Sequence, residues 1–334
     1  MKTLQEALKD FFEKKQQLRK VFTFIGGDTA APGYHIRCQM SDRTRLPYTV
    51  CEAYAEYLAP AYNELAEVLR RELATRPPFR RGRAIGPDDL WLWGGPTPEW
   101  GGSMDPDTLV KNAAYFGAQN GVYVYGPINE EMVARQAPLK RVLAMVNKEC
   151  RAPGQQPESD AECAENLSRL SLKYPNIVGG IMDDMTSHAA TISPEKLAEV
   201  AGVSAGLKKH NPALELYGVV YREELGVKDF SPLLPHLDGV NFWFWKQEEL
   251  LDVAEGVELC RKNFPGKKIL LGLFIHDYGR TDVGAMPELL LHELKAARQM
   301  LADGLINGLV VLGDREILKW PEQAAVVKGF LEAQ

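Results

Sequence analysis

The chain has 334 residues, 45% of them apolar, which is enough to bury a large core. Its formal charge of −6 argues against non-specific binding of nucleic acid, because an acidic surface repels a polyanion. The five cysteines are odd in number, widely spaced and without a CxxC pair. They predict free thiols in a reducing compartment rather than a disulfide framework or a zinc site.

Residues 1–20 carry charges throughout and apolar residues at helical spacing, which predicts an amphipathic helix and not a signal peptide. The longest apolar runs, such as residues 269–275, are far too short to span a bilayer. We therefore expect a cytoplasmic protein without a membrane partner. The sequence implies no oligomeric state.

Residues 1–88, which include this helix, are predicted to form an extension packed on the main domain. The runs at 21–27 and 34–40 suggest a β-hairpin, since the second alternates polar and apolar residues. A helix is expected from about Thr49 to about Leu73, and residues 70–83 are expected to form an exposed linker. Alternatively, residues 21–27 could be the first strand of a barrel.

From residue 89 onward, short apolar runs alternate with helical stretches. The runs are mostly continuous, as expected of strands buried on both faces. There are eight of them, at 89–95, 121–126, 141–147, 176–184, 214–221, 238–245, 268–275 and 306–313. Eight strand–helix units predict an α/β fold, a (β/α)8 TIM barrel over residues 89–334 with a helical and hairpin extension over 1–88. An open doubly wound sheet is the alternative, but no GxGxxG or GxxxxGK[ST] turn is present to favour it.

In a TIM barrel the functional site lies at the carboxyl ends of the strands. The fourth predicted strand ends in Asp183 and Asp184, after a run of Ile, Val, Gly and Met. A carboxyl in such dry surroundings can have a raised pKa and act as an acid. Because adjacent strand residues point opposite ways, we expect only one of the pair to enter the site. A structural role, in which one Asp caps the following turn or pairs with an Arg, is the alternative.

The seventh predicted strand ends in His276, Asp277 and Tyr278, across the ring from the fourth. A carboxyl on each side of a bound sugar is the arrangement that glycoside hydrolysis requires. The alternative is that His276 and Asp277 form a structural pair.

Four of the six tryptophans lie in two strands at a spacing of two, so each pair shares a face. Their flat rings suit the apolar faces of sugars, although either pair could instead pack the barrel wall. These residues are Trp91, Trp93, Trp243 and Trp245.

Further polar residues end the third, fifth and eighth strands, among them Glu149, Tyr221 and Asp314. Asp184, Glu149, His276 and Asp314 could together hold a divalent cation, since hard cations bind carboxylate oxygens. The sequence has neither HxH nor HEXXH, so we predict no metal site and no cofactor.

At GGIMDD, VVYREEL, NFWFW and LFIHDYG the sequence resembles bacterial TIM-barrel proteins of the glycoside hydrolase type, in layout over about residues 89–316. In the large retaining-hydrolase clan the acid/base and the nucleophile end strands four and seven, where this chain has Asp183-Asp184 and Asp277. The clan normally has Glu at both positions. The chitinase-like family ends its fourth strand in DxxDxDxE, and IMDDM lacks the closing Glu. The resemblance thus implies sugar binding more than one particular mechanism.

These observations predict a carbohydrate-active enzyme, a glycoside hydrolase acting on a carbohydrate or another small polar substrate. Asp184 or Asp183 would be the general acid/base, Asp277 the second carboxylate, and Tyr221 a catalytic-site residue. Substrate would be bound by Trp93, Trp243, Trp245, His276, Tyr278, Glu149 and Asp314. A metal-assisted barrel lyase or isomerase and a non-catalytic sugar-binding barrel are the alternatives.

Overall fold

The computed structural model describes residues 2–24, 48–97, 102–147, 159–186, 191–276, 284–313 and 315–334. Eight parallel strands pair in sequence order, and the first also pairs with the last, so the sheet closes into a barrel. The strands are β1 (Leu90–Gly94), β2 (Asn120–Tyr123), β3 (Arg141–Met145), β4 (Ile177–Met182), β5 (Glu215–Tyr221), β6 (Gly239–Trp243), β7 (Lys268–Leu273) and β8 (Gly308–Leu312). Each falls within or overlaps one of the eight predicted runs, so the (β/α)8 barrel is confirmed.

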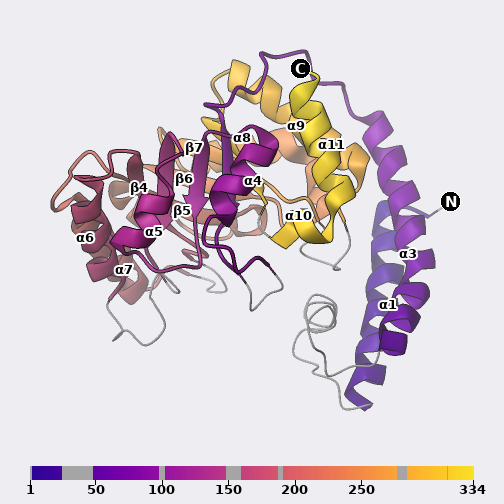
Figure 1. Ribbon diagram of the computed structural model, residues 1–334. Helices are drawn as coiled ribbons and strands as arrows, with labels where there is room; N and C mark the ends of the chain where they lie inside the picture. Colours follow the sequence, from indigo (N-terminus) through magenta and orange to yellow (C-terminus); the bar gives the residue numbers. More distant parts are fainter. Residues whose placement is uncertain are drawn as a thin grey trace.

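Helices cover the outside of the barrel (Figure 1). They are α4 (Thr108–Phe116), α5 (Glu130–Arg135), α6 (Asp160–Ser171), α7 (Pro194–Lys208), α8 (Val253–Asn263), α9 (Pro287–Ala302), α10 (Arg315–Lys319) and α11 (Pro321–Glu332), with short 3₁₀ helices η2 (Arg222–Glu224), η3 (Ser231–His236) and η4 (Gln247–Asp252). The capping box of Ser159 and Glu162 and the N-cap of Ser193 form as predicted. Among the described residues, no helix has both the length and the hydropathy that crossing a bilayer requires.

Alternate residues of each strand point into the barrel, and these inward residues form one closed apolar cluster. It contains Trp91, Trp93, Val122, Val124, Leu143, Met145, Ile181, Tyr217, Val219, Trp243, Leu270, Val310 and Leu312. Outward residues such as Leu92 and Phe242 pack against the helices in a second cluster. Large rings fit inside because glycines face them: a Cβ at Gly272 would overlap the indole of Trp243.

Two long helices, α1 (Leu4–Phe24) and α3 (Tyr48–Thr75), pack side by side along one flank of the barrel (Figure 1). Arg70 of α3 forms an ion pair with Glu288 of α9 at 2.9 Å, which joins the pair to the barrel. The helix predicted from about Thr49 is confirmed, and it extends through the first six residues of the expected linker at 70–83.

The first arm of the predicted hairpin is wrong, because residues 21–24 continue α1. The alternative that residues 21–27 are a barrel strand is also wrong, since the ring of eight strands is closed without them. The apolar run was ambiguous by pattern alone, and the helix that begins upstream extends into it as far as Phe24. The second arm, at 34–40, lies outside the described residues.

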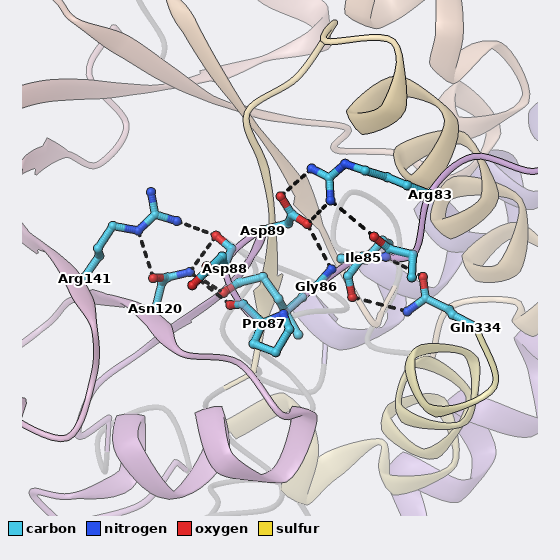
Figure 2. Close-up of polar contacts among 11 residues, drawn as sticks. Arg83, Ile85, Gly86, Pro87, Asp88, Asp89, Asn120, Arg141 and Gln334 are labelled. Carbon is cyan, nitrogen blue, oxygen red and sulfur yellow. Dashed lines mark hydrogen bonds and ion pairs between the residues drawn. The ribbon is translucent and has the colours of Figure 1, made fainter.

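The amino-terminal end of β1 is closed by polar contacts shown in Figure 2. Arg83 donates to the carboxylate of Asp89 at 2.5 and 2.6 Å, and the Gly86 N–H donates to the same carboxylate at 2.9 Å. The side chain of Gln334 accepts from the Ile85 N–H at 2.7 Å, which ties the last residue of the chain to the start of the barrel.

A second part of this network joins β1 to β2 and β3 (Figure 2). The Asn120 amide donates to the carbonyls of Pro87, Asp88 and Leu90 at 3.0–3.2 Å, and its oxygen accepts from Arg141 Nε at 3.0 Å. Asn120 therefore links the start of β1 to β2 and β3 through its own hydrogen bonds.

Candidate active site at the carboxyl ends of the strands

Asp183 follows β4 directly and is almost fully buried, with 8% of its surface exposed. Its backbone N–H donates to Asn147 Oδ1 at 2.9 Å, and Asn147 Nδ2 donates back to its carbonyl at 2.8 Å. The Tyr125 hydroxyl donates to Asp183 Oδ2 at 3.4 Å. Asn147, after β3, thus fixes the backbone of Asp183, and Tyr125, after β2, bonds to its carboxylate.

Asp184 lies in the left-handed region, with φ of 46°, which a residue other than glycine adopts only at an energetic cost. The Tyr221 hydroxyl, at the end of β5, donates to Asp184 Oδ1 at 2.6 Å. Within the described ranges only one other non-glycine residue has a positive φ, and that is Tyr125 at 60°. Both strained positions therefore belong to the same group of side chains.

The left-handed turn bears on the expectation that only one Asp would enter the site. Strand alternation ends at Asp184, so its carboxylate does not turn to the outer face. Instead, Asp183 and Asp184 each bond to a tyrosine that packs on the inward apolar cluster. The two carboxylates lie at one mouth of the barrel, between β2 and β5.

Glu224 holds the strand end that carries Tyr221. Its carboxylate accepts from the Tyr221 N–H at 2.8 Å and from Thr186 Oγ1 at 2.9 Å, and it forms a buried ion pair with Lys228 at 2.5 Å. Because Thr186 follows the aspartate pair, this buried acid joins the ends of β4 and β5. Glu224 thus orients the site.

The tryptophans differ in accessibility. Trp93 and Trp243 are 3% and 2% exposed and form a T-shaped contact at 5.8 Å, so they are the floor beneath the mouth. Trp245 is half-buried, with its ring 5.1 Å from Tyr221 and 6.3 Å from Phe274. Trp91 is buried near the opposite end, under the guanidinium of Arg141. The two rings of each pair share a face, as predicted, but they lie at different depths.

His276 is buried and stacks flat on Trp320, with ring centroids 4.4 Å apart. Burial lowers its pKa to about 4, against the opposing effect of nearby Glu316, so the ring is neutral at pH 7. Its ring lies 5.9 Å from that of Phe274. The histidine is packed behind the aromatic wall of the mouth.

Four predicted site residues lie outside the described residues: Glu149, Asp277, Tyr278 and Asp314. Over the ranges that are described, no group of three or more His, Cys, Asp or Glu side chains is arranged to hold a metal ion.

Sequence reasoning missed Tyr125 and Phe274 as members of the site. Tyr125 was hidden in the second apolar run, and only its left-handed backbone sends its hydroxyl to Asp183. Phe274 is one residue past β7 and contacts both Trp243 and Trp245. Continuing the inward alternation of β7 by one step would have found it.

No protein-family model and no curated protein sequence matches the chain. Solved structures do resemble it. A candidate α-L-fucosidase from Bacteroides thetaiotaomicron has a TM-score of 0.51 and 10% identity, over 77% of this chain and 96% of its own. A glycoside hydrolase family 18 chitinase from Chromobacterium violaceum has a TM-score of 0.48 and 11% identity, over 76% and 84% of the two chains. At these identities the likeness concerns the fold alone, and that fold is the TIM barrel.

Proposed function

We propose that this protein is a glycoside hydrolase with Asp184 as its general acid/base. The observation that carries the proposal is the pair of adjacent carboxylates at the end of β4, each bonded to a phenol from a different strand end. Asp184 is the more exposed of the two and has the shorter bond, so it is the group that substrate can reach. Asp183, nearly buried and bonded on both sides, orients the pair.

Hydrolysis of a glycoside needs a second carboxylate, and we assign this role to Asp277. It follows β7, three strands on from β4 around the ring, so the two acids would flank a sugar bound over the mouth. In an inverting enzyme the two carboxyls are about 6.5–9.5 Å apart, and in a retaining enzyme about 5–5.5 Å. Their separation would therefore indicate the stereochemical outcome.

The half-buried indole of Trp245 is the surface on which we expect a sugar ring to stack. Tyr221 and Phe274 meet it edge-on, which holds its plane, and Trp93 and Trp243 close the floor below. Glu149, Tyr278 and Asp314 remain predicted substrate-binding residues. His276 is 1% exposed, so the role we propose for it is to support the aromatic wall through Phe274. The carbohydrate named for the fucosidase of similar fold is consistent with a sugar substrate.

The test is turnover of a broad panel of aryl glycosides by the wild type and by Asp183→Asn, Asp184→Asn and Asp277→Asn. A general acid contributes about 10²–10⁴-fold, so we expect Asp184→Asn to lose about 10³-fold in kcat/KM on the best substrate. Glu223→Gln is the matched control, because Glu223 is a half-exposed acid paired with Lys246 near the same mouth.

Full activity of both Asp184→Asn and Asp277→Asn would refute the paired-acid mechanism. Saturable oligosaccharide binding without turnover of any glycoside would instead identify a sugar-binding barrel. Loss of activity with chelator, restored by Mn²⁺ or Mg²⁺, would point to metal-assisted chemistry.

A further inference from the structure

A cavity of about 450 Å³ opens at the amino-terminal end of the barrel, opposite the proposed active site. Its walls include the rings of Trp91 and Tyr217 and the charged heads of Arg141, Glu215 and Lys268. This volume lies in the usual range for small-molecule sites, which are mostly apolar with a few convergent polar groups.

The charges around this cavity do not cancel. Glu215 is fully engaged: it pairs with Lys268 and accepts from the Tyr217 hydroxyl at 2.9 Å. Arg141 donates only to neutral groups, Asn120 Oδ1 and the Asp88 carbonyl, and it lies 4.8 Å from the Trp91 ring centre. In the part of the chain that the structure describes, no carboxylate forms an ion pair with Arg141. Its charge acts at longer range on Asp89, which is already paired with Arg83.

Two further residues at this cavity have N–H groups that donate no hydrogen bond to a described residue. Trp91 is 4% exposed, and its Nε1 has no hydrogen-bond partner, although buried indole N–H groups usually have one. Asn307 uses its side-chain oxygen to accept from the Ile269 N–H at 2.9 Å, so its amide NH₂ remains to donate at the rim.

A neighbouring hollow of about 470 Å³ shares Lys268 and Asn307 with this cavity and is lined by Lys262 and Lys267. Neither of these two lysines forms an ion pair with any described residue. The whole chain carries a net charge of −6, whereas the charged residues that line this hollow are four cations and one carboxylate, so the sign is reversed locally. They are Arg261, Lys262, Lys267, Lys268 and Glu258. Such a field attracts anions to the pole.

We propose that this pole of the barrel binds a small oxyanion, a carboxylate or a phosphate monoester, between Arg141 and Lys268. A planar guanidinium binds either group through two parallel hydrogen bonds, and Arg141 is already oriented by Asn120 and by stacking on Trp91. The Asn307 amide and the Trp91 N–H would complete the donor set, and the aromatic walls would cover the organic part of the ligand.

The experiment is isothermal titration calorimetry of the full chain with inorganic phosphate and, separately, with acetate, at an ionic strength held constant with KCl. We expect saturable binding of at least one of the two, with Kd of about 1 mM or tighter. The two probes distinguish a phosphate site from a carboxylate site. Arg141→Gln should weaken binding at least tenfold.

Because Arg141 also bonds to neighbouring strands, Asn307→Asp is the second variant. It keeps the oxygen that accepts from Ile269 and replaces the donor at the rim with a negative charge. We expect it to weaken binding at least tenfold as well. Lys9→Gln is the control, since it removes the same charge from an exposed position on α1. Absence of saturable binding at 10 mM of both probes, or unchanged affinity in Asn307→Asp, would overturn the proposal.

Discussion

The two ends of this barrel differ in how their polar side chains are bonded and in their backbone conformation. At the amino-terminal end, the Asn120 side chain donates to three backbone carbonyls, and Arg83 donates two hydrogen bonds to Asp89. At the carboxyl end, two adjacent carboxylates share a short segment, and both described non-glycine residues with positive φ occur there. Positive-φ backbone and adjacent carboxylates are thus found at the carboxyl end, while hydrogen bonds and an ion pair fix the start of β1 at the other end.

The largest effect we predict is on the floor between the two ends. Trp243→Ala should lower the free energy of unfolding by about 3–5 kcal/mol, because it removes a buried indole from the barrel interior. Urea denaturation measures this. Trp245→Ala at the half-exposed rim is the matched control and should lose much less stability while losing sugar affinity. Equal losses in stability would show that the rim and the floor are a single packed layer.

The next effect concerns pH. The pKa of His276 is about 6.5 when unfolded and about 4 when folded, so the unfolded chain binds more protons in this window. The wild type should therefore lose about 3 kcal/mol relative to His276→Phe as the pH falls from 7 to 4. Phe retains the ring that stacks on Trp320.

The difference in unfolding free energy between the wild type and His276→Phe reports the titration of His276 alone. Burial raises the pKa of Glu293, which acts with the opposite sign, but Glu293 is common to both chains and its contribution cancels. Denaturation midpoints measured at several pH values test this, and parallel curves for the two chains would contradict it.

At the amino-terminal end we predict a loss of stability without a loss of activity. Burial alone would raise the pKa of Asp89, but bonds from Arg83 and the Gly86 N–H hold it below its usual value. Asp89→Asn should cost about 2 kcal/mol of unfolding free energy and leave kcat/KM unchanged. Asp303→Asn breaks the more exposed pair with Arg80 and should cost less than about 1 kcal/mol. A fall in kcat/KM for Asp89→Asn would mean that the two ends are coupled.

The smallest effect we predict is at the mouth. Tyr221→Phe removes the 2.6 Å bond to Asp184 and should lower kcat about tenfold, or about 1.4 kcal/mol, with unfolding free energy nearly unchanged. Tyr125→Phe removes a longer bond of 3.4 Å and should have a smaller effect. The reverse order would assign the acid/base role to Asp183.

Much of the fold could be read from local pattern. Eight apolar runs separated by capped helices predict the barrel, because buried parallel strands leave continuous apolar segments in the sequence. The same reasoning failed at residues 21–24, where the apolar residues continue α1. A short apolar run fits a strand or a helix equally well, and the structure of the adjacent segments determines which one forms.

Some features of the candidate site likewise follow from the sequence, and others follow only from the tertiary structure. The sequence by itself determined that two aspartates end the fourth strand and that two tryptophan pairs each share a face, since both follow from order and periodicity along one strand. Only the tertiary structure decided that Asp184 turns back through a left-handed residue to meet Tyr221 and that Trp243 is floor while Trp245 is rim. It also decided that Arg141 faces a cavity without a carboxylate partner among the described residues. These features depend on contacts between strand ends far apart in the chain, which exist only after the barrel has closed in one register.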